Sequence, residues 1–218
     1  MKIHQAACVI SLALWATLAQ AEEMHSSDLS ATRGADAAPK LAYGQMIRYG
    51  GKTVFSPCRD RSFTQFEDAS RDGYIGKVLD QLGLSAGKKL YVEVLGAREG
   101  DVLKATDLNF AQTEGRCQMP GGRTEVWRAS GNEPAWVLAF GAEFVQVKRS
   151  GQPEVVVPAA PLTRAPGLAT FAASQGNQRV SLRFERTLCH DTMADAVFGW
   201  TARVTVNGET LNGCAWQR

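Results

Sequence analysis

A tight turn sets the pairing register of the last two strands predicted for this 218-residue chain. One cysteine precedes this hairpin and another lies in its second strand. Asn207-Gly208 forms the turn, because both central residues of a type I′ turn need positive φ angles, which asparagine and glycine tolerate best. The expected cross-strand pairs are Val206 with Glu209, Val204 with Leu211, and Thr201 with Cys214. Val204 and Leu211 then share the buried face, and a bridge from Cys214 to Cys189 would tie the hairpin to the preceding strand.

The first residues predict export. Lys2 is followed by an apolar run, residues 6–18, and then by Ala19-Gln20-Ala21, a small-x-small cleavage site. The run is too short to span a membrane, and Cys8 precedes most of it and cannot serve as a lipoprotein cysteine. We therefore expect residues 1–21 to be a cleaved Sec signal peptide and the mature chain to lie in the periplasm without a transmembrane segment. Residues 22–40 lack an apolar period and predict a disordered leader.

Four cysteines remain after cleavage, namely Cys58, Cys117, Cys189 and Cys214. An even number in an exported chain predicts two disulfides, and three pairings can be drawn. Sequential pairing is favoured because a passage rich in proline and glycine, residues 119–131, separates the two pairs. The absence of a Cys-x-x-Cys motif favours structural crosslinks over a redox-active pair. The formal net charge of +2 argues against nucleic acid as a partner.

The first module, residues 41–118, is expected to be a small barrel of the OB type. Gly50-Gly51 predicts a hairpin, and Phe63 to Phe66 is a short aromatic strand. A helix should start near Ser70 and stop at Gly83, because apolar residues recur at helical spacing between them. A strand at 90–95 and one or two more within 101–110 complete this module.

A linker at 119–128 separates this module from a second one, residues 129–218, which is expected to be an all-β sheet or barrel. Alternating segments at 137–140, 144–147, 154–157 and 180–185 predict its strands. Val180, Leu182 and Phe184 should point inward, and prolines between 158 and 166 predict a loop. The fold class is therefore mainly β, an OB-like barrel with one helix followed by a second antiparallel unit.

The first module resembles a known family. Tyr43-Gly44-Gln45-Met46, the glycine hairpin, Phe55-Ser56-Pro57-Cys58, the helix, the strand at 90–95 and Cys117 follow one another as in the C-terminal OB-like domain of the bacterial envelope lipoprotein NlpE. Departures include Pro57, where the family has aspartate before the cysteine. The resemblance covers 41–117 and implies a fold and an envelope location, and it brings no catalytic residue.

The second module resembles another group. Gly131-Asn132-Glu133-Pro134-Ala135-Trp136, Cys189-His190-Asp191-Thr192-Met193 and Gly213-Cys214-Ala215 match, in order, the Gly-Asn-Glu-Pro-x-Trp, Cys-x-Asp-x-Met and Gly-Cys-Ala motifs of a bacterial envelope module. This resemblance spans 129–216. It implies an envelope protein, with no defined activity.

Glu133 and Asp191 are the carboxylates of these motifs. If the motifs meet, the two groups could act as an acid/base pair, which would require shifted pKa values in a cleft. The favoured interpretation is structural: Asn132 and Glu133 order the turn before Pro134, while Asp191 caps backbone N–H groups. We therefore expect no catalytic residues and no enzyme.

The other candidate binding residues are Trp136, His190, Met193 and Trp200. His190, Asp191, Met193 and Asp195 mix hard and soft ligands and lack free thiolates, so the predicted metal site is none, with copper as the alternative. No nucleotide-binding fingerprint occurs, so no cofactor is expected. The indoles favour core packing, although several at one rim could form a ligand platform.

The leading functional hypothesis is a non-enzymatic periplasmic protein that binds another envelope component, and a role in envelope-stress surveillance follows from the NlpE resemblance alone. Two alternatives belong to other classes. One is a periplasmic protein that binds copper or a lysozyme, and the other is a carboxylate-based enzyme acting on cell-wall glycans through Glu133 and Asp191. The sequence leaves the ligand or partner and the oligomeric state open.

Overall fold

The structure, a computed structural model, describes residues 39–59, 62–113, 115–117 and 125–218. Three predicted segments lie outside the described residues: the expected signal peptide, all of the expected leader except residues 39 and 40, and residues 119–124 of the expected linker. Within the described ranges the protein is mainly β, as the sequence predicted. The helices in those ranges are too short to cross a membrane.

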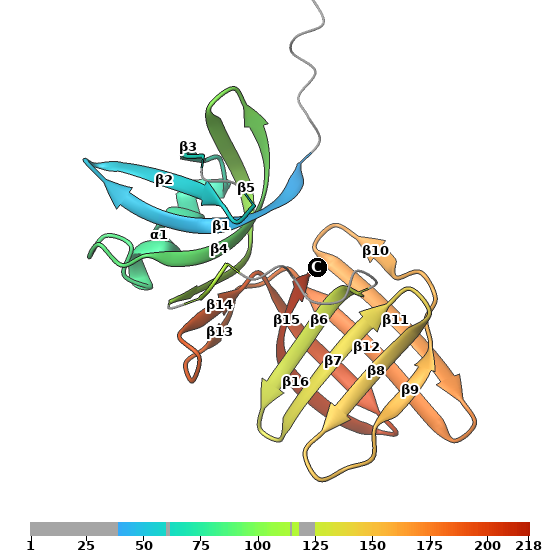
Figure 1. Cartoon of the computed structure of the whole chain (residues 1–218). Helices are drawn as coiled ribbons and strands as arrows, with labels where there is room; N and C mark the ends of the chain where they lie inside the picture. The colour runs from blue at the N-terminus through green and yellow to red at the C-terminus, as the bar shows by residue number, and fades with distance from the viewer. Residues whose placement is uncertain (1–38, 60–61, 114, 118–124) are drawn as a thin grey trace, which may run out of the picture. The chain divides into compact units, whose positions relative to one another are not determined.

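The first β unit is a closed five-stranded barrel (Figure 1). Its strands are β1 (Lys40–Tyr49), β2 (Lys52–Pro57), β3 (Thr64–Asp68), β4 (Leu90–Glu99) and β5 (Val102–Thr113). The ring runs β5-β3-β2-β1-β4 and closes because β4 also pairs with β5. The predicted glycine hairpin is confirmed, since Tyr49 faces Lys52 across Gly50 and Gly51, which both have positive φ. The 101–110 segment forms a single strand that extends to Thr113.

A short helix, α1 (Tyr74–Gln81), follows a single 3-10 turn, η1 (Arg71–Gly73), and packs its apolar stripe against the barrel core. Ile75, Val78 and Leu79 are buried, as their spacing predicted. The carboxylate of Asp68 accepts hydrogen bonds from the N–H groups of Ser70 at 2.9 Å and Gly76 at 2.7 Å. These bonds satisfy donors at the start of the helix, which explains why it begins after Ser70.

The second β unit is a curled antiparallel sheet (Figure 1). Its strands are β6 (Glu125–Asn132), β7 (Ala135–Gly141), β8 (Phe144–Arg149), β9 (Val155–Pro158), β10 (Thr163–Ala165), β11 (Leu168–Gln175), β12 (Gln178–Glu185), β15 (Trp200–Val206) and β16 (Glu209–Gln217). Their order is β10-β11-β12-β15-β16-β6-β7-β8-β9. The alternation in β12 is confirmed, because Val180, Leu182 and Phe184 are buried.

The terminal hairpin has the register that the sequence predicted. Val206 pairs with Glu209, Val204 with Leu211, and Thr201 with Cys214. Asn207 and Gly208 have φ angles of 51° and 92°, which is the conformation of a type I′ turn. Both disulfides are sequential, Cys58 with Cys117 and Cys189 with Cys214.

A small hairpin from late in the sequence completes the first sheet. Its strands are β13 (Cys189–Asp191) and β14 (Ala196–Phe198), and β14 pairs with the end of β5, where Phe198 faces Phe110. The sequence analysis placed these residues in the second module. The disulfide from Cys189 to Cys214 and a cluster that includes Phe110, Phe198 and Trp216 connect the hairpin to β16.

Two details differ from the sequence-based expectation. Residues 163–165 form β10, within the stretch 158–166 where prolines predicted a loop. β6 begins at Glu125, so the last four residues expected in the linker belong to a strand. Propensity misses both strands because pairing with neighbouring strands, supplied by the tertiary fold, stabilises them.

Candidate functional site

The closed barrel is hollow at one end, where residues of all five of its strands meet. The cavity has a volume of about 230 Å³. Its walls include Ala42 and Tyr43 of β1, Phe55 of β2, Thr64 of β3, Arg98 of β4 and Leu103 of β5. Ligand pockets are typically concave and mainly apolar, with a few polar groups that orient the ligand, and barrel mouths are a common place for them.

Two arginines supply the charge of this cavity. The guanidinium of Arg59 lies 5.9 Å from the ring centroid of Tyr43, within the range of a cation–π contact. The Nε of Arg98 donates a hydrogen bond of 3.0 Å to the carbonyl of Gly100. Both side chains are exposed, whereas Phe55 and Leu103 are buried. The cavity therefore combines an apolar interior with cationic groups in its wall.

The Cys58–Cys117 disulfide stands between this cavity and a second, more open hollow of about 730 Å³. Ile47, Phe63, Lys89 and Arg116 line the second hollow. Phe63 is 66% exposed, which is unusual for a large aromatic side chain. Both hollows share Pro57 and Cys58 in their walls, and both combine apolar with cationic side chains.

Sequence reasoning identified only the disulfide cysteines of this region. The other wall residues lie near the ends of the five strands, apart from Arg59 in the turn after β2, and they meet only because the sheet closes. Arg59 and Arg98 are 39 positions apart in the sequence, 98 − 59, and no local pattern joins them. Once the order of strands around the barrel is known, the residues at the strand ends indicate which side chains line the cavity.

The motifs chosen from the sequence do meet, where the end of β6 lies beside the β13–β14 hairpin. The Nδ2 of Asn132 donates a hydrogen bond of 3.1 Å to Oδ1 of Asp191. The same oxygen accepts hydrogen bonds from the N–H groups of Met193 at 3.0 Å and Ala194 at 3.3 Å. Asp191 therefore caps the turn between β13 and β14, as the structural interpretation expected. Glu133 is exposed and precedes a cis peptide bond to Pro134.

The glycines and the tryptophan of these motifs have a packing role. Trp136 is 3% exposed, and its Nε1 donates a hydrogen bond of 3.2 Å to the carbonyl of Asn212. A Cβ added to Gly131 would lie 2.3 Å from that Nε1, and one added to Gly213 would lie 2.9 Å from the indole ring. The indole of Trp136 therefore packs against two glycines, because a side chain at either position would collide with it. This explains why tryptophan and glycine occur together in these motifs.

The remaining candidates do not form one site. Trp200 is buried and makes an edge contact with Trp127, while His190 and Met193 are exposed at the β13–β14 hairpin. No group of three histidine, cysteine, aspartate or glutamate side chains is arranged to hold a metal ion in the part of the chain that the structure describes. The indoles of Trp136 and Trp200 belong to the hydrophobic core of the second unit.

Glu93 is a buried carboxyl group, 2% exposed, at the contact between the first barrel and β16. Its oxygens accept hydrogen bonds of 2.8 Å from the hydroxyl of Tyr91 and 2.8 Å from Nδ2 of Asn109. Burial raises the pKa of Glu93, and the two hydrogen bonds oppose that rise. Asn109 also exchanges hydrogen bonds with the backbone of Gln217, at 3.0 and 2.8 Å. Tyr91, Glu93 and Asn109 do not line the barrel cavity.

Comparisons with protein-family models, with curated proteins and with solved structures found no match to this chain.

Proposed function

We propose that this chain is a non-enzymatic periplasmic protein that binds an envelope component through the end of its first barrel, and that it takes part in envelope-stress surveillance. The component would present an apolar group beside an acidic one. The observation that carries this proposal is the apolar cavity formed by all five strands, with Arg59 and Arg98 in its wall.

The chemistry of the cavity supports a small amphipathic ligand group. Its volume of about 230 Å³ suits part of an acyl chain or an apolar side chain more than a whole cofactor. Phe55 and Leu103 offer apolar contact, and arginine binds carboxylate and phosphate groups through paired N–H donors. An apolar group with an acidic end would therefore find complementary partners here.

The covalent structure supports export. Both disulfides join cysteines that a reducing compartment would keep as thiols. The apolar run and cleavage motif of residues 2–21 agree with transport to the periplasm. The role in stress surveillance rests on the sequence resemblance to the NlpE domain.

A cavity-filling variant tests the proposal. Decanoate is expected to bind the oxidised chain saturably, with NMR shift changes at Tyr43, Thr64 and Leu103, and 1-decanol is expected to bind more weakly. Ala42→Trp should abolish binding because the indole occupies the cavity, and Arg98→Gln should weaken the binding of decanoate more than that of decanol. Ala165→Trp, at an exposed position of β10, is the control.

The wild type, Ala42→Trp and Ala165→Trp then serve as baits in periplasmic extract. A component held by the wild type and by Ala165→Trp, but not by Ala42→Trp, would identify the partner. Decanoate that binds Ala42→Trp as well as the wild type would refute the cavity as the site. Equal capture by all three baits would refute it as well.

A further inference from the structure

The outer face of the second β unit carries a polar groove that is separate from the barrel cavity. Its volume is about 630 Å³, and it lies over β12, β15 and β16. We call this hollow the arginine groove. Five of the residues that line it are Arg183, Glu185, Thr201, Arg203 and Asn212. The buried side chains of the same strands, such as Leu182 and Val204, point to the opposite face, so these five are directed outward.

Two arginines face each other across neighbouring strands of this groove. Arg183 of β12 pairs directly with Arg203 of β15, which in turn pairs with Asn212 of β16. Like charges at directly opposed positions of antiparallel strands destabilise a sheet. The repulsion between Arg183 and Arg203 therefore lowers the stability of the sheet, and an anion bound between them would reduce that repulsion.

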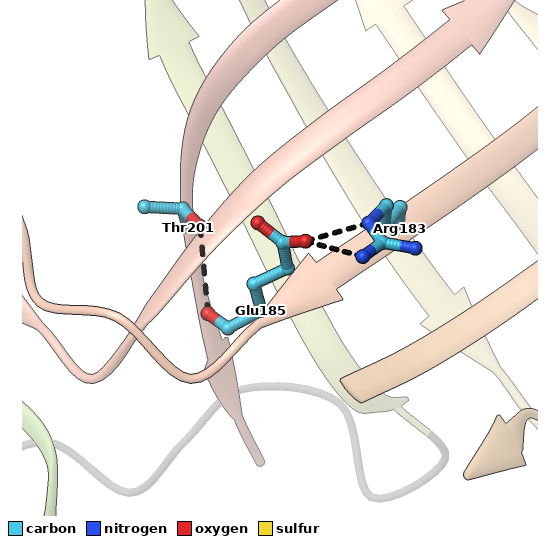
Figure 2. A network of polar contacts seen from close by, with 3 residues as sticks. All are labelled: Arg183, Glu185 and Thr201. Carbon is cyan, nitrogen blue, oxygen red and sulfur yellow. Dashed lines mark hydrogen bonds and ion pairs between the residues drawn. The ribbon is translucent and has the colours of Figure 1, made fainter. Parts of the chain in front are cut away.

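Only one of the two arginines has its charge balanced within the groove. Figure 2 shows that a single oxygen of Glu185, Oε1, accepts both contacts from Arg183, at 2.7 Å from Nε and 2.5 Å from Nη2. Arg203 has no ion-pair partner among the residues that the structure describes. The groove therefore keeps one uncompensated guanidinium, next to the exposed amide of Asn212.

The groove also offers hydrogen-bond acceptors. The second carboxylate oxygen of Glu185 points away from Arg183 in Figure 2 and is open to solvent on a side chain that is 48% exposed. The hydroxyl of Thr201 donates a hydrogen bond of 3.4 Å to the backbone carbonyl of Glu185, and its lone pairs remain available as acceptors. The donors Arg183, Arg203 and Asn212 thus form one cross-strand row, and the acceptors Glu185 and Thr201 form a neighbouring row.

We propose that the arginine groove binds an acidic saccharide, a sugar chain that carries carboxylate groups. Arg203 and Asn212 would hold a carboxylate, while Glu185 and Thr201 would accept hydrogen bonds from sugar hydroxyls. A phosphate polymer fits less well, because its denser negative charge is repelled more strongly by Glu185 and it offers no hydroxyl groups to Glu185 and Thr201. A protein partner fits less well because the groove lacks the aromatic anchors that dominate protein interfaces.

Titration calorimetry with defined oligosaccharides tests the proposal. Trigalacturonate is expected to bind the oxidised chain, and the uncharged galactotriose is expected not to bind. Arg203→Gln should weaken trigalacturonate binding by about tenfold or more, since a charge-assisted contact is lost. The matched control is Arg164→Gln, because Arg164 is an exposed arginine of β10, in the same unit but outside the groove. Thermal unfolding checks that both variants fold.

A second variant tests the choice of ligand class. Glu185→Ala removes the repelling carboxylate. The ratio of the affinity for trigalacturonate to the affinity for inorganic tripolyphosphate should therefore decrease. No trigalacturonate binding by the wild type, or equal effects of Arg203→Gln and Arg164→Gln, would overturn the proposal. Tripolyphosphate that binds the wild type as tightly, and that depends equally on Arg203, would overturn the assignment to a saccharide. None of these outcomes depends on the barrel cavity.

Discussion

At the scale of single residues, Glu93 is a buried carboxyl group whose ionisation opposes folding. Burial raises its pKa above the ordinary value of 4.5, so the folded chain keeps the proton at pH values where the unfolded chain has released it. The stability that comes from this group is complete below pH 4.5 and is lost as the pH rises through the raised pKa.

Glu93→Gln is expected to remove this pH dependence. The amide stays neutral, and the hydroxyl of Tyr91 can turn from donor to acceptor to meet the new NH₂ group. The variant should therefore gain stability relative to the wild type as the pH rises above 4.5, measured by urea unfolding at a series of pH values. Glu143→Gln, at an exposed position, is the control. Parallel pH profiles for the wild type and Glu93→Gln would contradict this account.

At the scale of elements, the Cys189–Cys214 disulfide fixes the β13–β14 hairpin to β16. Replacing both cysteines by alanine should lower the free energy of unfolding by roughly 3 kcal/mol, the loop-closure term for a bridge of this span. Hydrogen exchange at β13 and β14 should also become faster, because the covalent tie is lost. Urea unfolding and exchange measured by mass spectrometry provide the two readouts.

The other disulfide provides the comparison. Removing Cys58 and Cys117 together should cost slightly more stability, since the closed loop is longer, with a separation of 59 residues against 25. Exchange at β13 and β14 should then stay slow. Equal acceleration of the hairpin in both double variants would show that the Cys189–Cys214 bridge does not specifically hold it.

The sequence predicted those elements whose signals are local. Asn207-Gly208 defined a register because a two-residue turn leaves one pairing, and Val180 to Phe184 alternate within one strand. β10, β13 and β14 have three residues each and carry no period, so their existence depends on the strands beside them.

The same limit applies to the candidate sites. The meeting of Asn132 and Asp191 could be anticipated, because each lies in a short motif. The barrel cavity could not be anticipated, because it requires the ring order of five strands. The arginine groove could be predicted only in part. The hairpin register places Arg203 opposite Asn212, but the proximity of Arg183 depends on the pairing of β12 with β15, which has no local signal.

At the scale of the whole molecule, Asn109 couples the two β units. It is fully buried and bonds to Glu93 in the first barrel and to the backbone of Gln217 in β16. Asn109→Ala removes the hydrogen bonds to Oε2 of Glu93 and to the backbone of Gln217 and should cost about 1–3 kcal/mol. It should also split a single calorimetric transition into two. Asn177→Ala, in an exposed turn, should leave one transition. A single transition retained in Asn109→Ala would mean that other contacts suffice for coupling.

The late arrival of β14 has a consequence for how the protein reaches its native state. Because a chain is synthesised from its N-terminus, β5 is complete well before residues 196–198, which pair with Phe110, Ala111 and Gln112. During that interval, the backbone donors and acceptors at this end of β5 have no neighbour on that side, and an uncovered strand of this kind recruits strands from other molecules. Chains stalled before residue 196 are therefore expected to aggregate, and chains that extend past residue 198 are expected to stay monodisperse.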